Sequence, residues 1–134
     1  MASIVDVEGI GKTYAVKLQA AGVNTTDALL EMGAAPKGRK LLAEKTGVSE
    51  KLILEWVNHV DLYRIKGVGS EYADLLEEAG VDTVVELAAR KPENLHKAML
   101  ESNQKKDLVR KMPALSQVTE WVAQAKKLPR VVTY

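Results

Sequence analysis

The first stretch of the chain with a chemical signature is Val-Glu-Gly-Ile-Gly-Lys-Thr-Tyr-Ala, at residues 7–15. Gly-Lys-Thr ends the phosphate-binding loop of many nucleotide hydrolases, in which backbone amides and the lysine hold phosphate oxygens. That loop also needs a glycine five residues before the glycine of Gly-Lys-Thr, and Asp6 stands at that position. The stretch Gly-Ala-Ala-Pro-Lys-Gly-Arg-Lys, at residues 33–40, has correctly spaced glycines but Arg39 in place of the lysine. Neither stretch therefore predicts nucleotide hydrolysis.

An internal repeat gives the first stretch another meaning. Residues 9–29 align without a gap with residues 67–87, and ten of the 21 aligned positions are identical. The second copy keeps Gly-x-Gly and Tyr-Ala, but Ser70-Glu71 replaces Lys12-Thr13. What the repeat preserves is thus a glycine turn, and not the Gly-Lys-Thr sequence.

The repeat extends beyond the glycine turns. A weaker similarity links the segments around Trp56 and Trp121. Together these similarities divide the chain into two related halves, 1–62 and 63–134. The junction at residues 61–64 contains no Gly-rich or Ser-rich linker. We therefore expect the two halves to pack against each other as one compact unit.

Apolar residues recur with the period of an amphipathic helix through most of the chain. Gly22 and Gly80 stand where helices should end, and Thr83-x-x-Glu86 is a capping box that opens a helix. Only the tail, residues 130–134, has the alternation of a strand. We expect an all-α fold of short helices. The aromatic residues expected in its cores are Tyr14, Trp56, Tyr72 and Trp121.

Composition narrows the possible functions. The 134 residues include no cysteine, which excludes disulfides and thiolate chemistry. No segment reaches the 18 apolar residues of a membrane span, so we expect a cytoplasmic protein without a membrane partner. His59 and His96 have no partners at metal-binding spacing, and no carboxylate pair has a catalytic setting. We therefore expect no enzymatic activity, no metal and no cofactor.

Both glycine turns carry a recognisable motif. Val7-Glu8-Gly9-Ile10-Gly11 and Ile65-Lys66-Gly67-Val68-Gly69 each stand before a helix that opens with small and apolar residues. This pattern resembles the helix–hairpin–helix motif, and two such motifs in each half would resemble the tandem helix–hairpin–helix domain. Nearly the whole chain is similar to an uncharacterised prokaryotic family, domain of unknown function 4332. The resemblance implies an all-α fold, and it implies a function only by analogy.

In helix–hairpin–helix proteins, the amides of the hairpin and of the next helix N-terminus face a DNA phosphate. The resemblance thus implies non-sequence-specific binding of double-stranded DNA, weak and dependent on salt. The first half is favoured because Lys12 follows Gly11 and no acid intervenes before Asp27. The nucleic-acid-binding residues implied are Gly9, Ile10, Gly11, Lys12, Thr13 and Lys17, with Lys37, Arg39 and Lys40 as a second contact.

The second hairpin departs from this pattern. Glu71 would face an incoming phosphate as a like charge, at the start of an acidic segment, residues 71–86. We expect this hairpin to have a structural role only; its residues are Gly67, Val68, Gly69 and Ser70. Substitution of Gly11 or Gly69 should be costly if each turn needs the backbone freedom of glycine.

An alternative belongs to another class of function. The acidic segment 71–86 and the basic segment 90–111 could dock a protein partner or a second copy of the chain. Both hairpins would then be structural, without a nucleic-acid role. The net charge of +1 favours this alternative, because dedicated DNA-binding proteins are usually more basic.

Overall fold

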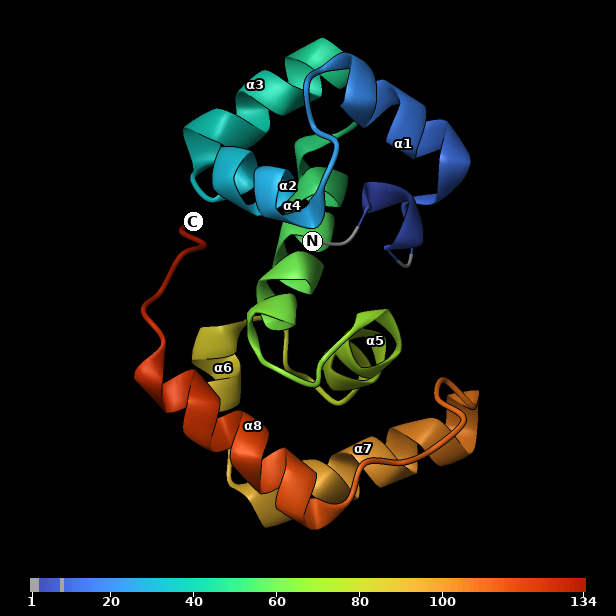
Figure 1. Cartoon of the computed structure of the whole chain (residues 1–134), viewed down its shortest axis with the longest axis vertical. Helices are drawn as coiled ribbons and strands as arrows, with labels where there is room; N and C mark the ends of the chain where they lie inside the picture. The colour runs from blue at the N-terminus through green and yellow to red at the C-terminus, as the bar shows by residue number, and fades with distance from the viewer. Residues whose placement is uncertain (1–2, 8) are drawn as a thin grey trace. The chain divides into compact units, whose positions relative to one another are not determined.

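The computed structural model describes residues 3–7 and 9–134, which form helices and connecting segments with no strand among them (Figure 1). The all-α prediction is confirmed for this part of the chain. The chain forms two compact units, the first made of Met1–Asp61 with Val131–Tyr134 and the second of Leu62–Arg130. The first division falls one residue before the predicted one. The last four residues, which were expected in the second half, belong to the first unit.

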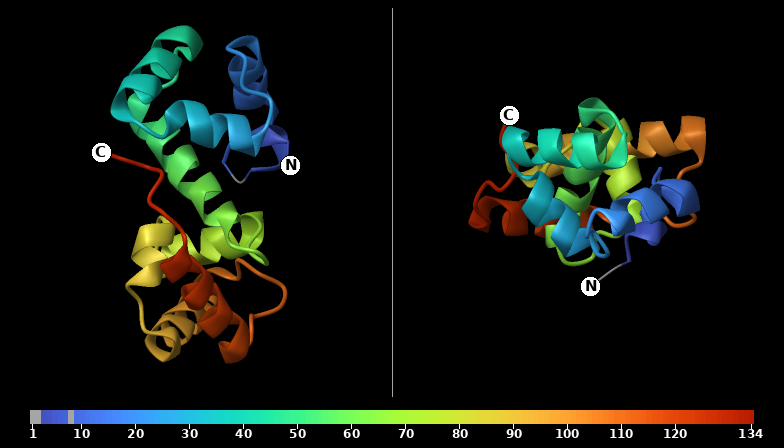
Figure 2. Two further views of the ribbon diagram at one scale, coloured as in Figure 1. Left: turned by 60° about the vertical axis from the view of Figure 1, so that its left-hand side comes forward. Right: turned by 90° about the horizontal axis from the view of Figure 1, so that it is seen from above.

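Both units follow the same order of elements: a 3-10 helix and then four α-helices (Figure 2). The first unit contains η1 (Ile4–Asp6), α1 (Gly11–Ala20), α2 (Thr26–Gly33), α3 (Pro36–Thr46) and α4 (Glu50–Asp61). The second contains η2 (Leu62–Arg64), α5 (Ser70–Glu78), α6 (Val84–Ala88), α7 (Pro92–Lys106) and α8 (Leu115–Lys127). The repeat in the sequence therefore corresponds to a repeat of elements.

Helix boundaries follow from local chemistry. The hydroxyl of Thr25 accepts from the Ala28 amide at 3.1 Å at the start of α2, and Thr83 does the same for Glu86 at the start of α6. Such caps satisfy amides that have no acceptor inside the helix. Gly47 ends α3 in the left-handed conformation, with φ +74°. No helix among the described residues is long and apolar enough to cross a membrane.

Each unit has its own core, built mostly from Leu, Val and Ile. In the first unit, η1 and helices α1 to α4 all contribute buried apolar side chains, and Trp56 of α4 is among them. In the second, the core surrounds Trp121 and includes Leu75, Leu76, Leu87, Leu95 and Met99. In each unit the glycine turn lies against the last helix, beside the tryptophan of the core. The candidate site lies at these turns.

The corner between α2 and α3 is closed by a buried arginine. The Arg39 guanidinium donates to the carbonyls of Gly33 at 2.8 Å and Ala34 at 2.9 Å. A side chain added at Gly33 would collide with Val57, and one added at Gly38 would collide with the main chain of α2. The near-match to a phosphate-binding loop at residues 33–40 is thus a site of close helix packing.

The C-terminal tail is held by the same corner and forms no strand. The Thr133 amide donates to the Ala34 carbonyl at 2.8 Å, and Arg39 donates to the Thr133 carbonyl at 2.6 Å. Val132 is buried, and the Tyr134 hydroxyl lies 3.3 Å from the side-chain oxygen of Asn58. These contacts explain why the last four residues belong to the first unit.

Candidate nucleic-acid interface

The first glycine turn connects η1 to α1. Gly9 and Gly11 have φ values of +87° and +63°, in the left-handed region that favours glycine. Between them, the Ile10 amide donates to the Val7 carbonyl at 3.1 Å, and the Ile10 side chain is buried. Ile10 therefore anchors the turn in the core, while both glycines remain exposed.

An aromatic pair supports this turn from behind. The ring centroids of Tyr14 and Trp56 lie 5.0 Å apart with an interplanar angle of 61°. A Cβ added at Gly9 would lie 3.8 Å from the Trp56 indole nitrogen, so the turn rests on the edge of that ring. Trp56 is buried and Tyr14 is half-buried. Both residues thus have the core positions that the sequence predicted.

The start of α1 is open toward solvent. Its N-cap residue, Ile10, makes no side-chain capping hydrogen bond, and its first turn contains no acid. Within residues 3–7 and 9–134, no residue outside the helix accepts from the amides of Gly11, Lys12 and Thr13, and all three residues are exposed. Glu8, which belongs to the predicted motif, lies outside the described residues. This helix end therefore offers uncapped amides beside a lysine.

Lys17 is exposed but lies on another side of α1. It follows Lys12 by five residues, which places it about 140° further around the helix axis. Its ammonium nitrogen lies 5.8 Å from the centroid of the Tyr14 ring, within the range of a cation–π contact. Lys17 therefore adds to the positive field around α1, whereas Lys12 is the lysine next to the open amides.

The structure does not bring the predicted second contact to this helix end. Lys37 and Lys40 are exposed on α3, and Figure 1 places the start of α3 and the start of α1 on opposite sides of the first unit. Arg39 is only 5% exposed and donates to three backbone carbonyls. Its assignment to a phosphate-binding surface does not fit this geometry, because its guanidinium is already used in the α2–α3 corner and the tail.

The second glycine turn has a different backbone. Gly67 has φ +96°, but Gly69 has φ −106° and ψ −162°, an extended conformation that any residue adopts. No atom lies within 4 Å of a Cβ added at Gly69. The expectation that Gly69 needs the freedom of glycine is therefore wrong, and Gly67 is the constrained position. Val68 is buried, as Ile10 is in the first turn.

A side-chain clamp holds the second turn to α8. The Lys66 amide donates to the side-chain oxygen of Gln124 at 2.9 Å, and the Gln124 side-chain amide donates to the Lys66 carbonyl at 3.2 Å. Tyr72 and Trp121 pack behind the turn, with ring centroids 5.3 Å apart. A Cβ added at Gly67 would lie 3.0 Å from the Trp121 indole nitrogen. The second turn therefore rests on its own Tyr–Trp pair, as the first turn does.

The first turn of α5 contains an acid, unlike that of α1. Glu71 is exposed in its first turn, where it suits the helix dipole. Further along the helix, Glu78 forms an ion pair of 3.0 Å with Lys106 of α7. A phosphate approaching this helix end would meet Glu71 as a like charge. The geometry therefore gives the start of α5 less affinity for an anion than the start of α1.

The comparisons with known proteins give one match. The family model described as Domain of unknown function (DUF4332) matches residues 8–128. The chain belongs to this family. No curated protein and no solved structure matches the chain. Membership of the DUF4332 family thus agrees with the resemblance seen in the sequence and assigns no activity to the residues above.

Two features of the site have only weak signals in the sequence. Gln124 stands three residues after Trp121, at a spacing that places both on one side of α8, yet nothing in the sequence pairs it with Lys66. The role of Arg39 also depends on a partner 94 residues away, the Thr133 carbonyl. Contacts between segments so far apart are decided by packing, which periodicity does not report.

Proposed function

We propose that this protein is a non-sequence-specific DNA-binding protein and that its first glycine turn is a helix–hairpin–helix motif. Backbone amides of Gly11, Lys12 and Thr13 would hold a phosphate oxygen, with the Lys12 ammonium beside it. The observation that carries the proposal is the uncapped, exposed start of α1, which has no acid in its first turn. A helix N-terminus of this kind attracts anions through its amides and its dipole.

The proposed interface is smaller than the sequence alone suggested. It comprises Gly9, Ile10, Gly11, Lys12 and Thr13, with Lys17 as an outer charge. Ile10 acts from the core side by holding the turn in shape. Lys37 and Lys40, on the far side of the unit, could contact only a different part of a duplex. Few phosphates are therefore neutralised, and we expect weak binding with a shallow dependence on salt concentration.

A duplex titration at several salt concentrations tests this proposal. Fluorescence anisotropy of a labelled duplex should give a negative slope of log affinity against log salt, of about −0.9 for each phosphate contacted. Lys12→Gln should reduce the magnitude of that slope by about 0.9. Lys97→Gln, on exposed α7 surface, is the matched control and should leave the slope unchanged. Absence of binding at low salt, or equal slopes for Lys12→Gln and wild type, would exclude the interface.

The alternative remains a protein-interaction or self-association module with structural hairpins. It is favoured by the segregated charge of the second unit, where the acidic segment 71–86 precedes the basic segment 90–111. Analytical ultracentrifugation separates the two proposals. A monomer that sediments with DNA supports DNA binding, whereas a salt-sensitive dimer that does not sediment with DNA supports the alternative.

A further inference from the structure

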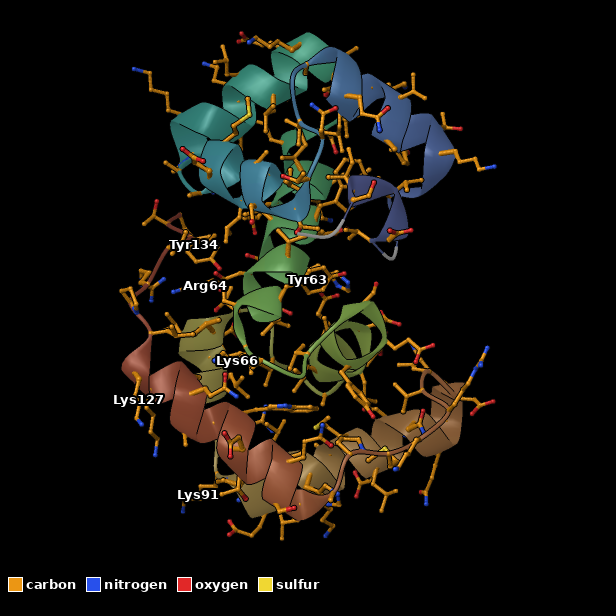
Figure 3. All side chains as sticks on the ribbon, in the orientation of Figure 1. Tyr63, Arg64, Lys66, Lys91, Lys127 and Tyr134 are labelled. Carbon is orange, nitrogen blue, oxygen red and sulfur yellow. The ribbon has the colours of Figure 1, made fainter. Side chains whose placement is uncertain are left out.

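A pocket of about 680 Å³ lies on the second unit, between the Gly67 turn and the first three turns of α8. Lys66 and Gly67 form one wall, and polar side chains of α8 form the other. Lys66 is labelled in Figure 3, where α8 runs below its label. The volume falls within the range of small-ligand sites. The pocket lies on the side of the turn that faces α8, and no residue of α5 is part of its lining.

The floor of the pocket carries a hydrogen-bond donor that an entering ligand can reach, the indole N–H of Trp121. Trp121 is 1% exposed and lines the pocket. In the part of the chain that the structure describes, no residue accepts a hydrogen bond from its indole N–H. The indole nitrogen itself is not among the buried polar atoms that lack a partner, so solvent reaches it through the pocket. An oxygen atom of a ligand that enters the pocket can therefore replace water as the acceptor of this N–H.

A second donor lies next to the first. A Cβ added at Gly67 would lie 3.0 Å from the Trp121 indole nitrogen and 3.8 Å from the side-chain nitrogen of Gln117. The two nitrogens thus flank the same point beside the glycine main chain. Because Gly67 has no side chain, an acceptor atom can approach both donors there.

The start of α8 and Lys66 add positive charge. The N-cap residue of α8, Ala114, makes no side-chain capping hydrogen bond, and the first turn contains no acid. Ser116, in that first turn, lines the pocket and can donate through its hydroxyl. Lys66 is exposed at the opposite wall. Glu120 lies in the lining as well, and its carboxylate limits how much negative charge the pocket accepts.

We propose that this pocket is a binding site for a singly charged oxyanion, the chemistry shared by a phosphodiester and a carboxylate. The indole N–H of Trp121, the Gln117 side chain and the Ser116 hydroxyl donate to its oxygens, and Lys66 balances its charge. Glu120 disfavours a doubly charged group such as inorganic phosphate. This site is separate from the start of α1, and it does not rest on DNA binding by the first unit.

The test uses the indole resonances of the ¹⁵N-labelled full chain, which has two tryptophans. The probes are dimethyl phosphate and acetate, each at matched ionic strength, with inorganic phosphate as the doubly charged comparison. We expect saturable movement of the Trp121 indole resonance with at least one monoanion, weaker movement with inorganic phosphate, and none for Trp56. The Trp121→Phe variant assigns the resonance. The monoanion that binds more tightly shows whether the natural ligand is a phosphodiester or a carboxylate.

Substitutions of exposed residues distinguish binding in this pocket from nonspecific effects of the anions. Lys66→Gln should weaken binding about tenfold, because it removes a charge-assisted contact. Glu120→Gln should tighten binding several-fold, because it removes a like charge. Lys97→Gln is the control and should change nothing. No movement of the Trp121 resonance with either monoanion, equal affinity in Lys66→Gln, or weaker binding in Glu120→Gln would overturn the proposal. Variants of Lys12 should leave this titration unchanged whatever they do to DNA binding.

Discussion

The two glycine turns share their support and differ at their surfaces. Gly9 and Gly67 both have positive φ and both rest on the indole edge of a buried tryptophan. At the start of the next helix, the first turn presents Lys12-Thr13 and the second presents Ser70-Glu71. The repeat therefore retains the residues that shape the turn, and it varies those that decide which charge can approach.

The clamp on the second turn also has no identical counterpart. Trp56 and Trp121 align at an offset of 65, so the position equivalent to Gln124 is His59 (124 − 65 = 59). Gln124 holds Lys66 by two hydrogen bonds, whereas His59 is buried in the first unit. The residue type at this position of the last helix thus differs between the units, as the residue types at the helix start do. This difference is why we assign different binding sites to the two halves.

The largest expected effect comes from removing the shared aromatic support. Trp56→Ala and Trp121→Ala should each lower the free energy of unfolding by about 3–5 kcal/mol, because each removes a buried ring from a core. Urea unfolding followed by circular dichroism measures the loss. Similar losses would mean that both turns depend on their tryptophan to the same degree. A loss below about 1 kcal/mol for either variant would contradict the burial of that ring.

A smaller effect is expected at a position where the units differ in polarity. Pro36 and Pro92 both open a helix, and the residue three positions later is Arg39 in one unit and the buried Leu95 in the other. Arg39→Leu should lower the free energy of unfolding by about 1–3 kcal/mol, because it leaves buried carbonyls without their donor. Urea unfolding measures this loss.

The same variant distinguishes a structural arginine from a DNA contact. If Arg39 only closes the corner, Arg39→Leu should bind DNA with the wild-type salt slope at temperatures where it is folded. A smaller slope of log DNA affinity against log salt, with unchanged stability, would show that Arg39 contacts a phosphate.

The glycines of the second turn offer a matched pair. Gly67→Ala should lower the free energy of unfolding by about 1–3 kcal/mol, because alanine rarely adopts φ +96° and its Cβ would crowd the Trp121 indole. Gly69→Ala should change it by less than about 0.5 kcal/mol, since that residue is extended and faces open space. Thermal melts of the two variants give the comparison. Equal losses of stability in the two variants would contradict the conclusion that Gly67 is the constrained glycine of this turn.

The smallest expected effect is on affinity. The double variant Ser70→Lys, Glu71→Thr gives the second turn the surface residues of the first. If those residues decide anion binding, its slope of log affinity for duplex DNA against log salt should steepen by about 0.9, one added phosphate contact. The anisotropy titration described above measures this slope. An unchanged slope would mean that the backbone difference at Gly69, rather than the charge, separates the two turns.

The sequence determined the helical fold, the repeat and the role of the turns as connections between helices. These features depend on local chemistry and on short periodicity, such as the glycine turns and the capping threonines Thr25 and Thr83. The family membership likewise follows from the order of residues along nearly the whole chain.

Only the tertiary structure decided what the polar side chains do. Arg39 is among the basic residues that the sequence assigned to a phosphate-binding surface, yet the Thr133 carbonyl and the α2–α3 corner use its donors. Gln124 and Trp121 gained their roles beside Gly67 only when α8 packed against the second turn. The physical reason is that hydrogen bonds and charges act over a few ångströms, and packing alone brings distant segments that close.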